Sequence, residues 1–374
     1  MECKDRVSTY FIIAGLLILM GASLVVHGLL SASITISTSG RISRVSWLHT
    51  SGTELYDSNN NLTRLYLAVI HDGQGFHVSQ SDIQHIADMG FKGVRFFIYW
   101  GICQPTANSI TSAYFSSGTG EPGRNAIDDI VNWCYAAGLY VLLCPGWGSY
   151  WQPPTWAISA SGLTCPDDPG GAHVDFLNSA TVQAGVNYLY SFMAQRYALY
   201  SNVMFESFNE LESESRPCSA SERQLFADFN NMWISAIEAN EGSTSHIKVL
   251  QLFYDWNSVN YVVNTPFLSG SHSNIILAVH SYPLAKSPYS EVHRIGTAWA
   301  NFAHGQNYPL TCTEGSNQQG GDLAQWASEI DLLGFVGFGY FNFASPTDNQ
   351  FYNLNYAPSA PAILAVLQPY MSRY

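Results

Sequence analysis

The chain has 374 residues, a length that fits one large domain. Its formal net charge is −13, from 15 Lys and Arg against 28 Asp and Glu, and it contains no basic cluster. This balance argues against nucleic acid or an anionic membrane surface as the ligand. Aromatic residues make up 14% of the chain, which is enough to build a core and also to line a groove for a neutral or cationic ligand.

An apolar run covers residues 10–30 and contains one His but no Asp, Glu, Lys or Arg. About 20 such residues can span a bilayer, and the small residues at 31–33 also suit the end of a cleaved signal peptide. We therefore expect residues 1–33 to be either a signal peptide or a membrane anchor. Residues 34–48 are then a spacer, and residues 49–374 form one exported domain, secreted or anchored to the outer face of the cell membrane.

Six of the seven cysteines follow this run, and an even number permits disulfides in an exported protein. Cys165 and Cys218 fall in long predicted loops, which makes them the first choice for a pair. Cys144 and Cys312 fall in predicted strands and are expected to be buried thiols. The sequence has no CxxC pair and no Cys/His spacing typical of zinc, so no structural zinc site is predicted.

From residue 60 onward, short β-branched and aromatic runs alternate with segments of helical periodicity. The predicted strands are 64–70, 93–99, 140–144, 203–207, 247–253, 275–280, 309–313 and 335–341. The predicted helices are 79–90, 125–138, 179–200, 221–240, 256–263, 290–304, 320–334 and 360–370. Continuous apolar strands, each followed by a helix, predict an α/β protein with a closed (β/α)8 TIM barrel, since no GxGxxG motif or P-loop marks an open nucleotide-binding sheet.

Three long stretches, residues 101–123, 145–178 and 211–219, follow the second, third and fourth predicted strands. In a parallel barrel such loops gather at the carboxyl ends of the strands, where active sites lie. The second loop is rich in aromatic residues. Its Trp147 and Trp151 are expected to cover the barrel mouth or to stack on sugar rings.

Chemically active side chains fall within the predicted strands or just after their carboxyl ends. They are Arg95, Asn209, Glu210, His280, Tyr282 and Glu314. Arg95 is the only charge in an apolar strand, so it needs a buried carboxylate partner, which Glu314 or Glu206 can supply. Glu206 is expected inside the barrel as a structural carboxylate, whereas Glu212 and Glu214 fall in the following loop and are expected to be solvated.

Four segments carry a resemblance to a known family. They are MGFKGVRFFIYW (89–100), NVMFESFNELE (202–212), AVHSYP (278–283) and PLTCTEGS (309–316). In their order and strand positions they resemble the marker segments of glycoside hydrolase family 5, the clan A barrels that include endoglucanases and β-mannanases. The resemblance spans residues 64 to about 345.

The resemblance implies a role for each matching residue. Glu210 would be the general acid/base, Glu314 the nucleophile, and Arg95 the cation that bonds the nucleophile. Asn209 would bond the sugar 2-hydroxyl. Retaining hydrolysis needs the two carboxyls about 5 to 5.5 Å apart. Beside Arg95, Glu314 would keep its charge, whereas Glu210, close to another carboxylate and to aromatic side chains, would hold its proton more tightly.

The same resemblance places His280 and Tyr282 near the cleaved sugar. The sequence departs from the family pattern in two places. Residues 144–147 stand where family members often carry a His after the third strand. Tyr340, Phe341 or Phe343 stand where a Trp usually forms the floor of the cleaved subsite.

The sequence therefore predicts a retaining endo-β-glycosidase that needs no cofactor and acts on a β-linked polysaccharide or oligosaccharide. A β-1,4-linked glucan is the first choice, with mannan or another β-glycan as the alternative. Two other classes compete with this interpretation. A non-catalytic carbohydrate-binding barrel is disfavoured because both carboxylates are retained, and a metal-dependent hydrolase because His71, His77 and His280 lack metal-like spacing.

Overall fold

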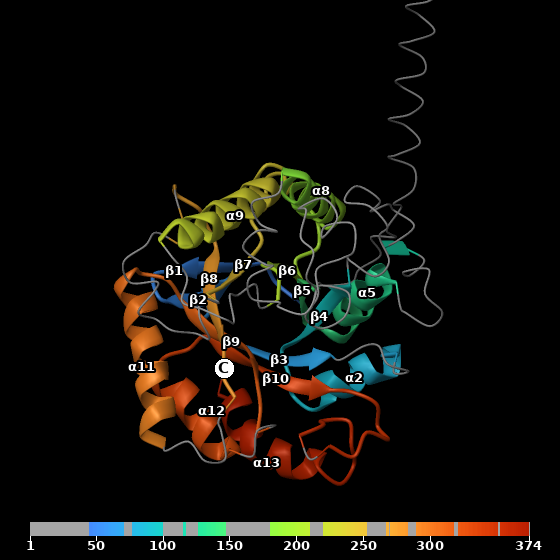
Figure 1. Cartoon of the computed structure of the whole chain (residues 1–374). Helices are drawn as coiled ribbons and strands as arrows, with labels where there is room; N and C mark the ends of the chain where they lie inside the picture. The colour runs from blue at the N-terminus through green and yellow to red at the C-terminus, as the bar shows by residue number, and fades with distance from the viewer. Residues whose placement is uncertain are drawn as a thin grey trace, which may run out of the picture. The chain divides into compact units, whose positions relative to one another are not determined.

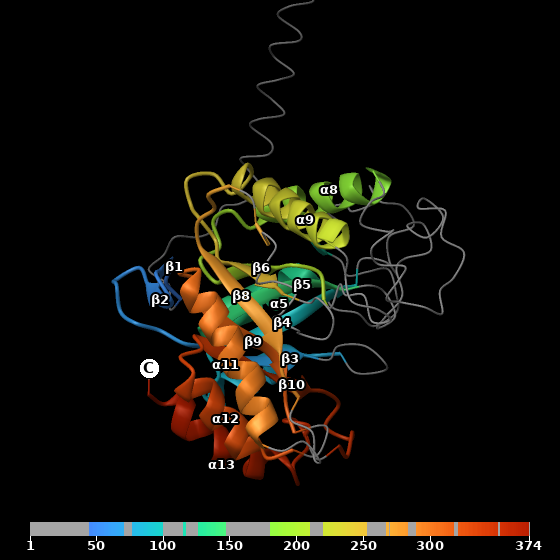
Figure 2. The ribbon, with the colours of Figure 1, turned by 60° about the vertical axis from the view of Figure 1, so that its left-hand side comes forward.

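Figures 1 and 2 show a computed structural model of the chain. The structure describes residues 45–70, 77–99, 115–116, 126–146, 180–209, 220–252, 267–268, 270–282, 289–317, 321–350 and 352–373. The apolar run at 10–30, Trp147, Trp151 and the cysteines Cys165 and Cys218 lie outside these ranges. Within the ranges, none of the helices combines the length and the apolar character that a bilayer crossing requires.

Eight parallel strands close into a barrel in the order β10-β3-β4-β5-β6-β7-β8-β9. They are β3 (Leu65–Ile70), β4 (Gly93–Tyr99), β5 (Tyr140–Gly146), β6 (Val203–Glu206), β7 (Lys248–Gln251), β8 (Ile275–His280), β9 (Leu310–Gly315) and β10 (Gly337–Phe343). The predicted TIM barrel is therefore confirmed, with every strand boundary within two residues of its predicted place. Most strand residues are buried, as expected for strands covered on both faces.

Helices surround these strands (Figure 1). They are α2 (Gln80–Asp88), α5 (Ile127–Ala137), α8 (Ala180–Arg196), α9 (Ala220–Glu238), α11 (Tyr289–Gly305), α12 (Leu323–Leu332) and α13 (Ala360–Met371). Ser79 begins α2 with a capping box shared with Asp82, and Gly138 ends α5 in the left-handed conformation at φ 78°. The short helix predicted at 256–263 lies outside the described residues.

A small antiparallel hairpin precedes the barrel and was not predicted. It consists of β1 (Leu48–Ser51) and β2 (Glu54–Asp57), which are too short and too polar to stand out in the sequence. Leu48 and Leu55 are buried in one cluster with residues inside the barrel. The Thr50 N–H donates to Asn274 Oδ1 (3.0 Å), just before β8 begins. The hairpin thus covers the amino ends of the strands and leaves the carboxyl ends to form the site.

Glycines in β10 allow the barrel to close. A Cβ at Gly337 would lie 1.8 Å from the Leu65 carbonyl oxygen, and one at Gly339 would lie 2.2 Å from that of Thr313. Gly337 also has φ 154°, a backbone conformation that other residues rarely adopt. The glycines therefore let β10 lie close to both β3 and β9.

Candidate active site

The Arg95 guanidinium lies at the centre of a polar cluster, which we call the Arg95 cluster. Arg95 is the third residue of β4 and is fully buried. Its Nε donates to Glu206 Oε2 (2.6 Å), and its Nη1 donates to Glu314 Oε2 (2.7 Å). Its Nη2 donates to Asn209 Oδ1 (2.7 Å). One planar cation thus connects residues at or just after the ends of two other strands, a geometry that suits arginine and not lysine.

Glu314 is the carboxylate of this cluster that solvent can reach. It is the last residue but one of β9, and its side chain is 10% exposed. Tyr282 donates its hydroxyl proton to Glu314 Oε1, while Arg95 bonds Oε2. A Cβ at Gly315 would lie 2.3 Å from the Ser281 carbonyl oxygen, so this glycine allows β9 to lie close to the end of β8. That approach brings Glu314 opposite His280 in the strand register.

Glu206 is the second carboxylate, and it is closed off. Its side chain has no exposed area. Its Oε2 accepts from Arg95, and its Oε1 accepts from Gln251 Nε2 (2.8 Å) at the end of β7. The Tyr190 hydroxyl donates to the Glu206 backbone oxygen (2.7 Å). With both carboxylate oxygens engaged, Glu206 has the internal, paired position that was predicted for it.

Cys144 occupies the place on β5 where the sequence departs from the family pattern. Arg95 Nη2 donates to Cys144 Sγ (3.2 Å), and the thiol donates to the Ser207 carbonyl oxygen (3.5 Å). Burial raises the pKa of Cys144 well above its ordinary value, although the charge of Arg95 opposes this shift. Cys144 is therefore a neutral thiol, and the prediction that Cys144 and Cys312 are buried free thiols is confirmed.

Burial also acts on the pKa values of His280 and Arg95. It lowers the pKa of His280 to about 4, although the nearby Glu314 carboxylate acts in the opposite direction. His280 is therefore neutral near pH 7, with its Nδ1 at 3.9 Å from Glu314 Oε2. Burial disfavours the charge of Arg95 too, but the carboxylates of Glu206 and Glu314 outweigh this effect and raise its pKa well above the ordinary value. Arg95 is a permanent cation.

The cluster brings together most of the candidate residues from the sequence. Arg95, Asn209, Tyr282 and Glu314 are joined by hydrogen bonds, and His280 lies beside them. The Asn209 N–H donates to the Pro145 carbonyl oxygen (3.0 Å), which holds the start of this loop against β5. Glu210 follows Asn209 in the sequence and lies outside the described residues.

Sequence reasoning missed Gln251. It is buried and bonds Glu206, and its backbone N–H donates to Ser207 Oγ (2.9 Å). A signal was present in the sequence, because Gln251 is a polar residue inside an apolar strand run, like Arg95. Among the described residues, no group of three or more His, Cys, Asp or Glu is arranged to hold a metal ion.

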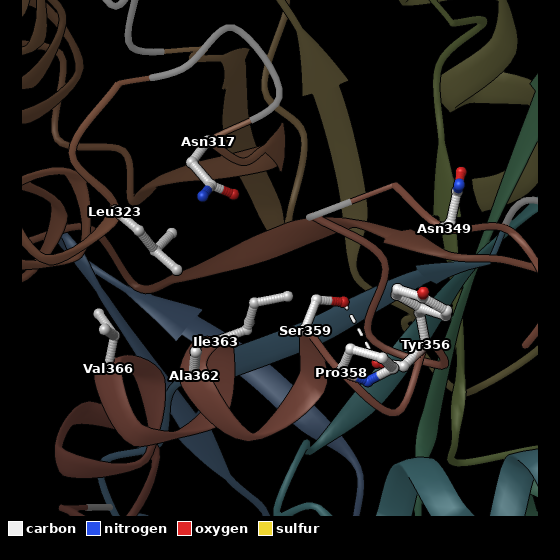
Figure 3. A pocket seen from close by; sticks show the side chains of 9 residues that line it. All are labelled: Asn317, Leu323, Asn349, Tyr356, Pro358, Ser359, Ala362, Ile363 and Val366. Atoms are coloured by element: carbon white, nitrogen blue, oxygen red, sulfur yellow. Dashed lines mark hydrogen bonds between the residues drawn. The ribbon is translucent and has the colours of Figure 1, made fainter.

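A separate pocket of about 470 Å³ lies beside α13 (Figure 3). Leu323, Ile363 and Val366 give it an apolar wall, and Asn317, Asn349 and the Tyr356 ring add polar groups. None of the nine described residues that line it carries a carboxyl, imidazole or thiol. It therefore has no carboxyl group for the hydrolysis of a glycosidic bond, whereas the Arg95 cluster has two.

A closed parallel barrel with carboxylates, an arginine and a tyrosine at the carboxyl ends of its strands belongs to the class of (β/α)8-barrel enzymes. Comparison with known families matches residues 56–348 to Cellulase (glycosyl hydrolase family 5). The chain belongs to glycosyl hydrolase family 5, as the marker segments predicted, and is a glycoside hydrolase.

Solved structures of the same fold include several glycanases. The catalytic domain of endoglucanase Cel5A (E5) from Thermobifida fusca matches with a TM-score of 0.60 and 15% identity, over 87% of this chain and 98% of that chain. A broad specificity endoglucanase from Clostridium acetobutylicum gives 0.60 and 15%, over 81% and 96%. An endogalactoceramidase gives 0.61 and 16%, over 86% and 78%. At these identities the likeness concerns the fold. A search of curated proteins found no significant match.

Proposed function

We propose that this protein is a retaining endo-β-glycosidase that hydrolyses β-1,4-linked glucan, with Glu314 as nucleophile and Glu210 as general acid/base. The observation that carries the proposal is the setting of Glu314. Arg95 holds one of its oxygens and Tyr282 the other, and the side chain keeps 10% of its surface exposed. A carboxylate fixed beside a cation, with a defined orientation, is what a glycosidase nucleophile requires.

The reaction proceeds in two displacements. Glu314 attacks the anomeric carbon and forms a covalent glycosyl ester, while the bond from that carbon to the leaving oxygen breaks. Glu210 gives its proton to the leaving oxygen. Water then attacks the ester, Glu210 takes a proton from that water, and Glu314 departs as a carboxylate. The role of Glu210 rests on its position directly after Asn209 in the marker segment.

The neighbours of Glu314 support this scheme. Arg95 bonds Asn209 through Oδ1, so the amide of Asn209 keeps its N–H donors for a sugar hydroxyl. His280 is neutral near pH 7 and therefore adds no second cation that would compete with Arg95 for Glu314. The Tyr282 ring stands edge-on to Phe341 on β10 at 6.2 Å between centroids, which fixes the hydroxyl toward Glu314.

The choice of glucan rests on the family and on the likeness to endoglucanases. The family is described as Cellulase, and structures of Cel5A from Thermotoga maritima, similar in fold to this chain, contain cellobiose in one case and mannotriose in another. A β-1,4-glucan is the first choice for this chain, and a β-mannan is the alternative. The net charge of −13 suits a neutral polymer. Because such a polymer is too large to import, we propose that the protein acts outside the cell, secreted or anchored through residues 10–30.

The test is a hydrolysis assay of the full-length protein, in mild detergent, on β-1,4-glucan, β-mannan and xylan. NMR of the first products should show retained anomeric configuration. Glu314→Gln and Glu210→Gln should each abolish turnover, and azide should partly restore activity to Glu314→Ala with inverted configuration. The matched control is Glu212→Gln, a nearby glutamate expected to be solvated, which should keep wild-type activity. Inverted products from the wild type, or an active Glu314→Gln, would refute the proposal.

A further inference from the structure

Two carboxylates share the Arg95 cation, although the proposed chemistry needs only one of them. Glu314 has a 10% exposed side chain, whereas the side chain of Glu206 is completely buried. Both oxygens of Glu206 accept hydrogen bonds, from Arg95 and from Gln251. Glu206 therefore cannot contact a substrate. A second buried carboxylate on one cation carries a desolvation cost, which the Arg95 and Gln251 contacts of Glu206 offset.

We propose that Glu206 and Gln251 are positioning residues for the hydrolysis. Held by Gln251, Glu206 fixes the orientation of Arg95 toward Glu314, and its negative charge offsets part of the positive charge that Arg95 presents to Glu314. This inference rests on the proposed function, because it assigns Glu314 as the nucleophile.

The geometry supports the first half of the proposal. Glu206 accepts a hydrogen bond from Nε, the guanidinium nitrogen nearest the side-chain stem. The two terminal nitrogens then point toward Glu314 and Asn209. Because the guanidinium is rigid, a bond at Nε leaves little freedom to rotate Nη1 away from Glu314. Gln251 in turn holds the other oxygen of Glu206 at 2.8 Å. The order of contacts therefore runs from Gln251 to Glu206, Arg95 and Glu314.

Electrostatics supports the second half. Arg95 carries one positive charge, and Glu206 neutralises part of its field before that field reaches Glu314. Among the described residues, the other polar groups close to this pair are uncharged near neutral pH. They are the Cys144 thiol from β5, the His280 imidazole from β8, and the hydroxyls of Tyr190 and Tyr282. Removing the charge of Glu206 should therefore leave more of the positive field of Arg95 to Glu314, and the acid limb of the pH–rate profile should move to lower pH.

The substitution Glu206→Gln removes the negative charge of this side chain and keeps its size and shape nearly unchanged. The new amide oxygen can still accept from Arg95 Nε, and its NH2 group can meet Gln251 if that amide turns its oxygen inward. We expect kcat at the pH optimum to stay within about tenfold of the wild type, with the acid limb of kcat/KM displaced by about one pH unit or more to lower pH.

Gln251→Met removes the amide that donates to Glu206 and keeps the charge of Glu206. It should lower kcat by about tenfold and leave the acid limb in place.

The assay measures kcat/KM from pH 3 to 8 for the full-length protein on the β-glycan that the wild type hydrolyses best. Glu241→Gln is the matched control, since it removes a buried carboxylate with a cation partner at the other end of the barrel. Its acid limb should coincide with that of the wild type. Near-UV circular dichroism checks folding, and Gln251→Met carries the test if Glu206→Gln does not fold.

The outcomes are distinguishable. If the wild type hydrolyses none of the β-glycans, the proposed function fails, and this inference fails with it. If the wild type is active but Glu206→Gln has an unmoved acid limb, or Gln251→Met has wild-type kcat, the positioning role alone is refuted.

Discussion

The barrel has a buried cation near each end, and the two are built differently. At the amino end, Lys248 at the start of β7 binds Glu241 (3.2 Å) and Glu238 (3.6 Å). These partners precede it by only 7 and 10 positions, Glu241 in the connection between α9 and β7 and Glu238 at the end of α9. At the carboxyl end, Arg95 binds Glu206 and Glu314, which follow it by 111 and 219 positions. The first cluster is local in sequence, and the second exists only when the barrel is closed.

The two clusters also differ in what remains accessible. Glu241 accepts from both the backbone N–H and Nδ1 of His246 and from Lys248, and its side chain is 4% exposed. Glu314, with its partly exposed carboxylate, faces the mouth. This is the division expected in a (β/α)8 barrel, in which the amino ends of the strands provide stability and the carboxyl ends provide chemistry. The two ends should therefore respond differently to substitution.

The largest expected effect is at the carboxyl end. Glu314→Gln should lower kcat by about 10⁴-fold or more, because it removes the proposed nucleophile. Its free energy of unfolding should change little, since Arg95 keeps Glu206 as a buried counterion. Steady-state kinetics and urea denaturation of the same preparation measure both quantities. A variant that loses activity and stability together would show that Glu314 also serves the fold.

At the amino end the pattern should be reversed. Lys248→Met leaves the buried carboxylate of Glu241 without this cation, and breaking such a pair costs about 3–5 kcal/mol. At 25 °C the folded fraction should keep wild-type kcat, because the Arg95 cluster is unchanged. Urea denaturation monitored by fluorescence, together with an activity assay in the absence of urea, tests this. A loss of kcat without a loss of stability would contradict the division between the two ends.

A smaller effect is expected from pH. His280 is buried, and its folded pKa of about 4 lies below the value of about 6.5 for an exposed histidine. The unfolded chain therefore binds more protons between these values, and stability falls as the pH is lowered from about 6.5 toward 4. The loss from this residue amounts to roughly 2 kcal/mol between pH 7 and pH 5. Denaturation curves at both pH values should show a smaller fall in His280→Asn, and an equal fall would exclude His280 as its source.

The smallest effect should come from a charge pair near the surface. Arg64, just before β3, has its Nη1 2.7 Å from Oε2 of Glu54 in the hairpin, with side chains 11% and 34% exposed. Such partly solvated pairs contribute about 0–1 kcal/mol. Glu54→Gln should therefore lower the unfolding free energy by less than about 1 kcal/mol and leave kcat unchanged. A loss as large as that of Lys248→Met would mean that the hairpin, and not burial of the charge, determines stability at the amino end.

The long-range cluster was easier to predict than the local one. Residues at the ends of parallel strands must meet, so Arg95, Glu206 and Glu314 could be assigned to one site once the strands had been recognised. The contacts of Lys248 depend on the path of a connection, which periodicity does not describe. The hairpin was missed for a related reason, because strands of four residues are stabilised by packing under the barrel and not by their own pattern.

Within the Arg95 cluster, the prediction stopped at the residues that resemblance or charge made visible. Gln251 is uncharged, and its importance comes from a single bond to a carboxylate on the neighbouring strand. The neutral state of His280 could not be predicted either, because it results from complete burial. Identity of a residue is visible in a sequence, but its solvent exposure is decided by the assembled barrel.

The glycine contacts of β10 have a consequence for biosynthesis. Translation proceeds from the amino terminus, so β10 leaves the ribosome long after β3, the strand it must join. Until then the nascent sheet has two unpaired edges, at β3 and β9, which are open to pairing with other chains. A bulky side chain at position 337 or 339 would hinder the pairing of β10 with β3 and β9, so these edges would stay unpaired for longer. Such a substitution would therefore lower the yield of folded protein and not the rate of a catalytic step.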